Sequence, residues 1–237
     1  MKLDNEELHE LLIEKHINHF HHANTVATAV TFLKEGGLLS RGYVEDDDLI
    51  QTSQSSDECD RHFDVLDDVF IDVVDLHGYF PRQNFYGPVL FKFSIDFLLD
   101  DNLDVWVTKN NPIYWNDKLK HSDKYFKSVR ELKRSWDDYP IQKKMFTIRK
   151  PNQPVLFDFL EEIIVDNPKL LIHQDISLKK EAMKALKKVT RRNKGLRDIL
   201  TLRKCNNCFC QDNYMKQVSV EELERLFLPA WHKYFRY

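Results

Sequence analysis

The chain has 237 residues, enough to bury one substantial core and fewer than chains usually have when they divide into separate domains. It carries a net charge of −3, is 42% hydrophobic and contains no run of about 18 apolar residues, which excludes a membrane-spanning helix. Residues 1–7 are acidic and polar, where an export signal would be basic and then apolar. We therefore expect a soluble, cytoplasmic protein with a single domain, residues 1–237.

The modest net charge conceals two segments of opposite sign. Residues 45–75 contain twelve Asp or Glu and one basic residue, Arg61. Residues 178–204 contain eleven Lys or Arg against two acidic residues. Because a dense cationic segment attracts polyanions by releasing their counterions, we expect nucleic acid as a partner of residues 178–204. The alternative is a helix whose charged face is simply solvated.

The N-terminal part predicts a helix, a strand and a second helix. Leucines at helical spacing indicate a first helix that starts at Asp4. A short strand over residues 13–20 is expected to follow and to carry the first histidines. Thr25 is a good N-cap for a helix over 26–35, and Gly36-Gly37 should end that helix because glycine accepts the left-handed closing conformation.

Later segments predict more strands and a helical end. The strands have β-branched or alternating patterns and cover residues 69–76, 88–95, 105–108, 145–148 and 162–165. Helical sequence is expected over 116–136, 178–203 and 220–227. The fold class is therefore α+β, with a mixed, largely antiparallel sheet core and flanking helices over residues 1–168. A basic helical C-terminal extension with a cysteine-rich turn follows over residues 169–237.

The stretch from His16 to His22 contains four histidines and is a candidate functional site. If residues 13–20 form a strand, His16 and Asn18 face one way and His19 faces the other. A catalytic metal is disfavoured, since no acidic partner lies at helical spacing and no zinc-hydrolase motif occurs. A metal-independent nuclease with two histidines as acid and base is chemically feasible, because imidazole titrates near neutral pH.

The cysteine-rich turn contains Cys205, Cys208 and Cys210. A Cys-x-x-Cys pair with a third sulfur nearby suggests structural zinc, for which a fourth ligand would have to come from elsewhere in the chain. His173, His232 and Cys59 are the candidates for that ligand. Buried free thiols are the alternative.

Aromatic residues accompany cations between residues 118 and 136. Tyr125, Phe126 and Trp136 are interleaved with lysines and arginines, an arrangement that suits single-stranded nucleic acid through charge and base stacking. The alternative is that these rings belong to the core.

Several motifs, in order along the chain, resemble the DarT-type ADP-ribosyltransferases, which modify nucleic acids using NAD. They cover nearly the whole chain and are His16-Ile17-Asn18-His19, Gly36-Gly37-Leu38-Leu39, Phe80-Pro81-Arg82, Pro88-Val89-Leu90-Phe91, Val105-Trp106-Val107-Thr108 and Leu160-Glu161-Glu162-Ile163. The resemblance implies an ADP-ribosyltransferase-like fold and NAD as co-substrate. It also implies a toxin or phage-defence role restrained by an antitoxin.

The resemblance assigns roles to particular residues. His16 would hold the nicotinamide ribose. One of Arg41, Arg61 and Arg82 would hold phosphate or activate the acceptor, since a guanidinium binds phosphate bidentately. The residues that would line the NAD site are His16, Asn18, Leu39, Ser40 and Arg82.

One position departs from the family pattern. The catalytic glutamate is expected at Met145, and methionine cannot act as a base. Glu161 and Glu162 are nearby carboxylates, but neighbours on a regular strand point to opposite faces, so at most one would face a pocket. The alternatives to a transferase are the histidine-dependent nuclease and a catalytically silent nucleic-acid- or nucleotide-binding protein of the same fold.

Overall fold

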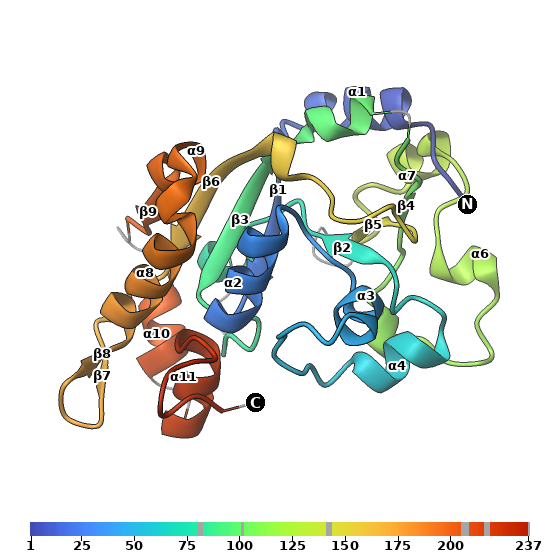
Figure 1. Cartoon of the computed structure of the whole chain (residues 1–237). Coiled ribbons are helices and arrows are strands. Elements are labelled where there is room, and N and C mark those ends of the chain that lie inside the picture. The colour runs from blue at the N-terminus through green and yellow to red at the C-terminus, as the bar shows by residue number, and fades with distance from the viewer. Residues whose placement is uncertain (80–82, 101, 141–143, 205–208, 216–218, 237) are drawn as a thin grey trace.

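The computed structural model describes residues 1–79, 83–100, 102–140, 144–204, 209–215 and 219–236. It is a mixed α/β structure whose strands are mostly antiparallel (Figure 1). The helices are α1 (Asn5–Glu14), α2 (Val26–Glu35), α3 (Arg41–Asp46), α4 (Asp57–His62), α5 (Leu76–Tyr79), α6 (His121–Lys124), α7 (Val129–Arg134), α8 (Leu178–Val189), α9 (Lys194–Asp198), α10 (Cys210–Met215) and α11 (Val220–Phe227). The 3-10 helices are η1 (Ile95–Leu99), η2 (Pro112–Tyr114), η4 (Phe157–Phe159) and η5 (Thr190–Arg192).

The strands form two main sheets and a hairpin. They are β1 (His19–Asn24), β2 (Val69–Ile71), β3 (Val89–Ser94), β4 (Val105–Val107), β5 (Phe146–Ile148), β6 (Leu160–Val165), β7 (Leu171–Ile172), β8 (Ile176–Ser177) and β9 (Leu200–Leu202). One sheet has the order β1-β3-β6-β9 and the other the order β2-β5-β4, while β7 and β8 form the hairpin. Among the described strands, β6 and β9 alone run parallel.

The two main sheets meet at one backbone bridge, His21 to Asp72, which is antiparallel. Through this bridge the strands follow the order β4-β5-β2-β1-β3-β6-β9. The ring of Phe20 lies 4.8 Å from that of Phe146 and 5.1 Å from that of Phe97, so aromatic packing joins the sheets where hydrogen bonding is sparse.

One face of the four-stranded sheet is covered by α2 and α8, which also pack on each other (Figure 1). Eight of the ten residues of α2 are buried, because the helix lies between the sheet and its neighbours. Helix α11 packs against both α2 and α8. The main cluster of buried hydrophobic residues includes residues from Leu3 to Leu228, so the C-terminal helices share the core of the sheets. A smaller cluster contains Val65, Trp115 and Tyr125.

Several predicted elements are confirmed. Asp4 caps α1, and Thr25 caps α2 by accepting a hydrogen bond from the Thr28 backbone N–H. Gly36 ends α2 at φ 83°, a left-handed conformation that costs glycine little. The helix predicted over residues 220–227 is α11, with its predicted bounds.

The strand predicted over residues 13–20 is wrong. Helix α1 continues to Glu14 because Leu8, Leu11 and Leu12 form a buried helical stripe that packs on η1. His16 then takes a left-handed turn at φ 58°, and the strand starts at His19. The histidines therefore have a different register from the predicted one.

The helix predicted over residues 178–203 is divided in the structure. Helix α8 ends at Val189, a 3-10 turn follows, and the Asn193 side chain caps α9 by accepting a hydrogen bond from Leu196 N. The remaining residues, 200–202, pair with β6 as an edge strand. Helix is likewise confirmed only in part over 116–136, where α6 and α7 are short. Among the described residues, no helix is both long and apolar enough to cross a membrane.

Candidate functional site

The structure separates the residues that the sequence grouped around His16. His16 and Asn18 are both exposed and lie in the turn before β1, so their predicted common strand face does not form. On β1 itself, His19 and His21 are the residues that share a face, because side chains alternate along a strand.

Leu39, Ser40 and Arg41 are engaged in local packing. Leu39 and Ser40 are 4% and 1% exposed, and the Ser40 backbone N–H donates to Gln153 Oε1 at 2.6 Å. Arg41 donates through Nε to Asp57 Oδ1 at 2.9 Å and through Nη1 to the Thr52 carbonyl at 2.8 Å. These contacts hold α3 and α4 in place. Both helices follow the histidine-bearing strand β1 in the chain.

Arg61 pairs with Glu45 at 2.7 Å on the surface, with half of its side chain exposed. Arg61 therefore forms a surface ion pair within the acidic segment. Arg82, Cys205 and Cys208 lie outside the described residues, as does the Cys210 side chain. Zinc at the cysteine-rich turn stays a prediction.

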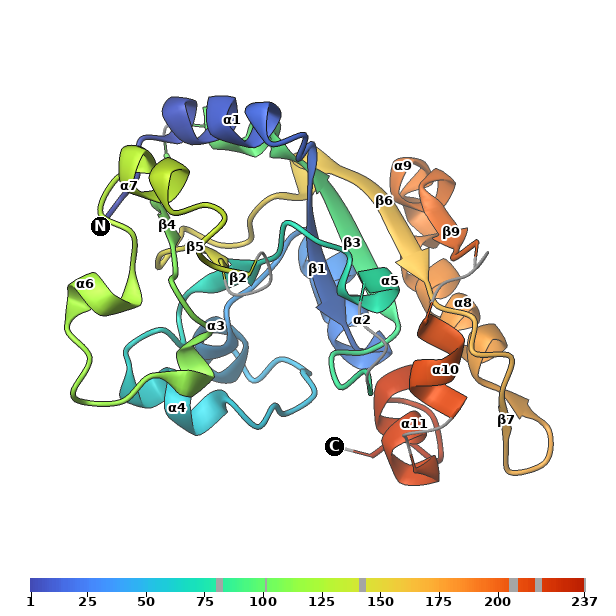
Figure 2. The ribbon, with the colours of Figure 1, turned by 180° about the vertical axis from the view of Figure 1, so that it is seen from behind.

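A row of polar side chains crosses the four-stranded sheet on the face turned away from α2. His21 of β1 lies opposite Lys92 of β3, and Lys92 lies opposite Glu162 of β6. Glu162 in turn accepts a hydrogen bond from the Thr201 hydroxyl of β9 at 2.8 Å. We call His19, His21, Lys92, Glu161 and Glu162 the open polar face. It belongs to the side of the sheet that Figure 2 presents, with α2 behind.

Both glutamates reach this face because the ladder between β3 and β6 is irregular. Lys92 pairs with Glu162, but the next residue, Phe93, pairs with Leu160, so Glu161 is an extra residue. A bulge of this kind can turn two successive side chains to one side. Glu161 Oε2 accordingly lies 3.0 Å from His19 Nε2, and Glu162 Oε2 lies 3.9 Å from Lys92 Nζ. The expectation that Glu161 and Glu162 would point to opposite faces is therefore corrected.

Four of the five side chains of the open polar face remain accessible, and His21 is largely buried. The side chains of His19 and Glu161 are 35% and 46% exposed, and those of Lys92 and Glu162 are 26% and 34% exposed. Burial lowers the pKa of His21 to about 4, against a partial opposing effect of the Asp75 carboxylate. His21 is therefore neutral at pH 7, with one ring nitrogen able to donate a hydrogen bond and the other able to accept one.

His22 occupies the opposite face of β1. Its Nδ1 lies 2.7 Å from the Phe70 carbonyl oxygen on β2, and its ring lies 5.9 Å from that of Phe32 on α2. Because a carbonyl only accepts, Nδ1 carries the proton in this contact. Burial lowers the pKa of His22 to about 4. The hydrogen bond from His22 to Phe70 therefore links β1 of the four-stranded sheet to β2 of the three-stranded sheet.

A second polar group, which we call the buried network, comprises Asp75, His77, Asp166 and Arg203. His77 Nδ1 lies 2.9 Å from Asp166 Oδ2, and the two side chains are 1% and 0% exposed. Arg203 donates to both Asp166 and Asp75. Burial acts to raise the pKa of Asp166, but His77 and Arg203 outweigh it and hold that pKa below its usual value.

The buried network is extended by an aromatic hydroxyl. Tyr214 of α10 donates to Asp166 Oδ2 at 2.9 Å and accepts from Asn84 Nδ2 at 2.7 Å. A cavity of about 10 Å³ adjoins His77 and Asn84, and this volume is sufficient for no more than about one water molecule. The network therefore ties the segment after β2 to β6, β9 and α10, and is not itself a ligand site.

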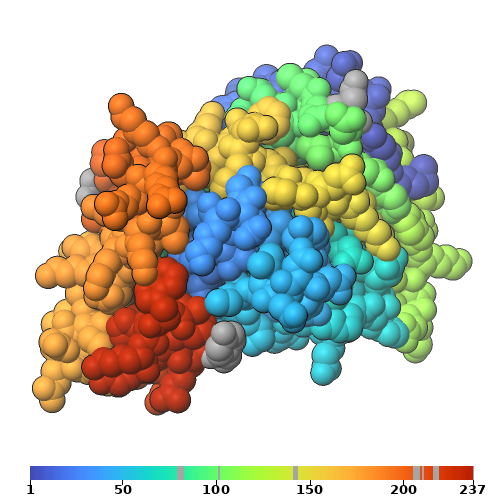
Figure 3. Space-filling model, viewed as in Figure 1, coloured from blue at the N-terminus to red at the C-terminus, as the bar shows by residue number. Residues whose placement is uncertain are grey.

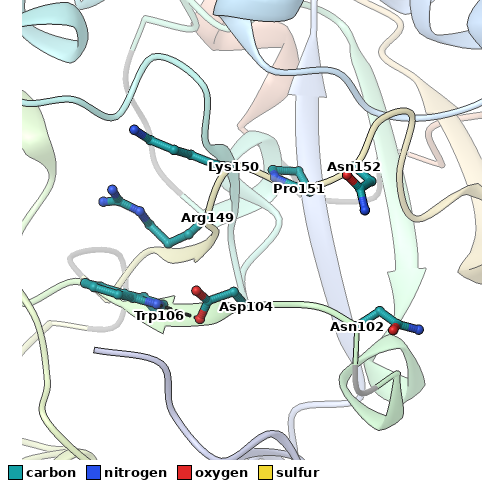
Figure 4. Close-up of a pocket in the computed structure, with 7 residues that line it drawn as sticks. All are labelled: Asn102, Asp104, Trp106, Arg149, Lys150, Pro151 and Asn152. Atoms are coloured by element: carbon teal, nitrogen blue, oxygen red, sulfur yellow. Dashed lines mark hydrogen bonds between the residues drawn. The ribbon is translucent and has the colours of Figure 1, made fainter.

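A hollow lies away from both groups, at the ends of β4 and β5 (Figure 4). Its volume is about 430 Å³, and its lining residues are Asn102, Asp104, Trp106, Arg149, Lys150, Pro151 and Asn152. The two cations are compensated. Arg149 Nε lies 3.3 Å from Asp68, and Lys150 Nζ lies 2.7 Å from Asp64. Trp106 donates its indole N–H to Asp104 at 2.8 Å. The hollow thus presents no unpaired charge for an anion.

Cations gather instead on α8, η5 and α9. We call their exposed side chains the basic face: Lys180, Lys184, Lys187, Lys188, Arg191, Arg192, Lys194 and Arg197. The aromatic residues that the sequence placed beside cations do not add to such a surface. Tyr125, Phe126 and Trp136 are 3%, 1% and 7% exposed, so they belong to the core and cannot stack on bases.

No protein-family model matches the chain, and no curated protein matches it in sequence. Within the part of the chain that the structure describes, no group of three or more His, Cys, Asp or Glu side chains is arranged to hold a metal ion.

Lys92 is a site residue that the sequence analysis missed, although a signal was present. It is the one charged residue in the otherwise apolar or small-polar strand Val89–Ser94, and a charge in such a strand indicates a face that is not packed. His21 had no comparable signal, since its face depends on where β1 starts.

Proposed function

We propose that this chain is an NAD-dependent ADP-ribosyltransferase that acts on nucleic acid, and that its reaction site is the open polar face. The observation that carries the proposal is the pairing of a histidine strand with two bulged glutamates: His19 and His21 beside Glu161 and Glu162. These glutamates supply the carboxylate that Met145 lacks. The mixed, largely antiparallel strand arrangement also supports the proposal, since the resemblance implies a core of this general class.

Transfer of ADP-ribose from NAD to a base requires a carboxylate such as Glu161 or Glu162 provides. The bond between nicotinamide and C1′ of its ribose breaks, and nicotinamide leaves with the bonding electron pair. A nitrogen or oxygen of a nucleic acid base forms the new bond to C1′, and its proton passes to a carboxylate. Glu162 is the carboxylate we assign to this step, because it is accessible and oriented by Thr201. The carboxylate also stabilises positive charge that develops on the ribose.

The basic face would bring the nucleic acid acceptor to the protein. Its cations continue through α9 to β9, the strand whose Thr201 contacts Glu162. A polyanion bound along α8 and α9 would therefore run toward the edge of the sheet that carries the reaction site. Transfer to nucleic acid would damage the cell, so we propose a toxin or phage-defence role with an antitoxin partner.

The test is transfer of label from NAD to polymer. The purified protein is incubated with NAD labelled in its adenylate part and with DNA or RNA, and the polymer is separated and counted. We expect labelled polymer, with labelling lost in Glu162→Gln. The matched control is Glu10→Gln, because Glu10 is an exposed glutamate of α1 that is not part of the open polar face. Equal labelling by Glu162→Gln and the control would contradict the assignment of Glu162.

A histidine-dependent nuclease is the second candidate, favoured by one observation. His19 and His21 share a face of β1, and Glu161 lies 3.0 Å from the His19 imidazole, as an acid and base pair with an orienting carboxylate requires. In the same assay, cut polymer beside intact NAD would identify this activity. Bound polymer with neither label nor cleavage would identify a catalytically silent binding protein.

A further inference from the structure

An exposed tryptophan lies against the basic face. Trp231, which follows α11, is 47% exposed, and Lys188 Nζ lies 4.5 Å from the centre of its ring. The contact forms because α11 packs on α8. Figure 3 shows the red C-terminal segment directly beside the orange surface of α8. If the charged face of α8 were simply solvated, its cations would be explained. The exposure of a large aromatic ring beside Lys188 would not be explained.

The row of lysines on α8 that includes Lys188 is largely uncompensated. Lys180, Lys184 and Lys188 follow one another every four residues, and are therefore about 6 Å apart along the axis of α8. The one ion pair found on this helix joins Lys184 to Glu181 at 3.8 Å, and that lysine is 78% exposed. Within the described residues, the basic face therefore offers a line of positive charge beside an aromatic ring.

We infer that Trp231 and Lys188 form a base-stacking anchor, at which an unpaired nucleotide of DNA or RNA stacks on the indole while its neighbouring phosphates lie along α8. Stacking on an aromatic ring and pairing with a cationic row are the two means by which proteins hold single strands without reading sequence. A duplex hides the faces of its bases, so it can use the cations but not the ring. This inference rests on the proposal that the basic face binds nucleic acid.

The experiment measures binding alone, in the absence of NAD. Fluorescence anisotropy is recorded with labelled single-stranded DNA, single-stranded RNA and the blunt duplex of the same sequence, and all three are compared at each of several salt concentrations. We expect Trp231→Ala to weaken binding of single strands about tenfold and to leave duplex binding nearly unchanged. Trp231→Tyr should restore most of the loss, since it keeps a ring. The two single-stranded arms show whether the anchor distinguishes DNA from RNA.

Two controls separate stacking from charge and from general damage. Tyr114→Ala removes a ring that is 67% exposed in η2, beside α4 in the acidic part of the chain, and should change nothing. Lys187→Gln should weaken single strands and duplex alike and reduce the salt dependence of both. Equal losses for single strands and duplex in Trp231→Ala, or no loss in either, would overturn the anchor.

Failure of the anchor and failure of the proposed activity remain distinguishable. Selective loss of single-strand binding without any label transfer would support the anchor and refute the transferase. Label transfer by the wild type together with unchanged binding by Trp231→Ala would refute the anchor and leave the transferase standing.

Discussion

The open polar face and the buried network are built from the same kinds of residue and differ in their environment. Each combines histidine and carboxylate with one cation, and both contact β6. In the buried network, Asp166 is wholly buried and is held by both His77 and Arg203. On the open polar face, Glu162 and Lys92 are partly exposed and 3.9 Å apart.

This difference assigns the two groups different tasks. A buried charge is costly unless every partner is present, so the buried network acts as one unit that fixes the fold. Exposed pairs contribute little to stability because water screens them, so the open polar face stays free to meet a ligand. The presence of acid and base residues is therefore not by itself evidence of a reactive site.

The largest expected effect comes from breaking the buried network. Asp166→Ala leaves Arg203 and His77 buried without their carboxylate, and we expect the free energy of unfolding to fall by about 3–5 kcal/mol. Urea denaturation followed by circular dichroism measures it. Glu162→Gln is the comparison and should change stability by about 0.5 kcal/mol or less. Similar losses in both variants would remove the distinction between the two groups.

For activity, we expect the larger loss from a change on the open polar face and the smaller loss from a change on the opposite face of β1. Glu162→Gln should reduce label transfer about 100-fold or more, the range expected for loss of a group that transfers protons. His22→Gln, on the opposite face of β1, should retain substantial transfer in the fraction that is folded. The measurement is the initial rate of labelling, normalised to folded protein. A larger loss in His22→Gln than in Glu162→Gln would move the reaction site to the other face of the sheet.

A smaller effect is expected from pH. Burial lowers the pKa of His22 from 6.5 to about 4, so the unfolded chain binds a proton at higher pH than the folded protein. The contribution of His22 to stability is therefore complete above pH 6.5 and is lost as the pH falls toward 4. Asp68 acts in the opposite direction, since burial raises its pKa to about 7. The wild type alone cannot separate the two.

A comparison of variants isolates the contribution of His22 to the pH dependence of stability. Thermal unfolding is measured at several pH values between 7 and 4 for the wild type, His22→Gln and the surface variant His62→Gln. We expect His22→Gln to lose less stability on acidification than the wild type, while His62→Gln follows the wild type. Parallel curves for all three proteins would show that His22 does not titrate differently on folding.

The smallest effect is expected at the turn before β1. His16 adopts φ 58°, which strains a residue with a side chain and suits glycine. His16→Gly should therefore raise the free energy of unfolding by about 0.5–1 kcal/mol and leave label transfer unchanged. Loss of transfer in this variant would return His16 to the role that the sequence resemblance gave it.

Local chemistry made some elements predictable from the sequence. The cap at Thr25, the apolar run of α2 and the closing glycine lie within a dozen residues, so the helix bounds follow from neighbouring residues alone. The bounds of α11 also agree with those predicted from its own sequence. The alternation in β3 likewise places Lys92 and Phe91 on opposite faces without knowledge of the partner strands.

Only the tertiary structure decided the site. The start of β1 depends on how α1 packs, and this start sets which histidines share a face. Glu161 and Glu162 lie together because of a register shift between β3 and β6, and Arg203 reaches Asp166 because residues 200–202 add to the sheet edge. These outcomes depend on contacts between residues far apart in the chain, and a single sequence carries no local signal for them. The sequence determined which groups the protein has for its chemistry, and packing decided which of them remained accessible.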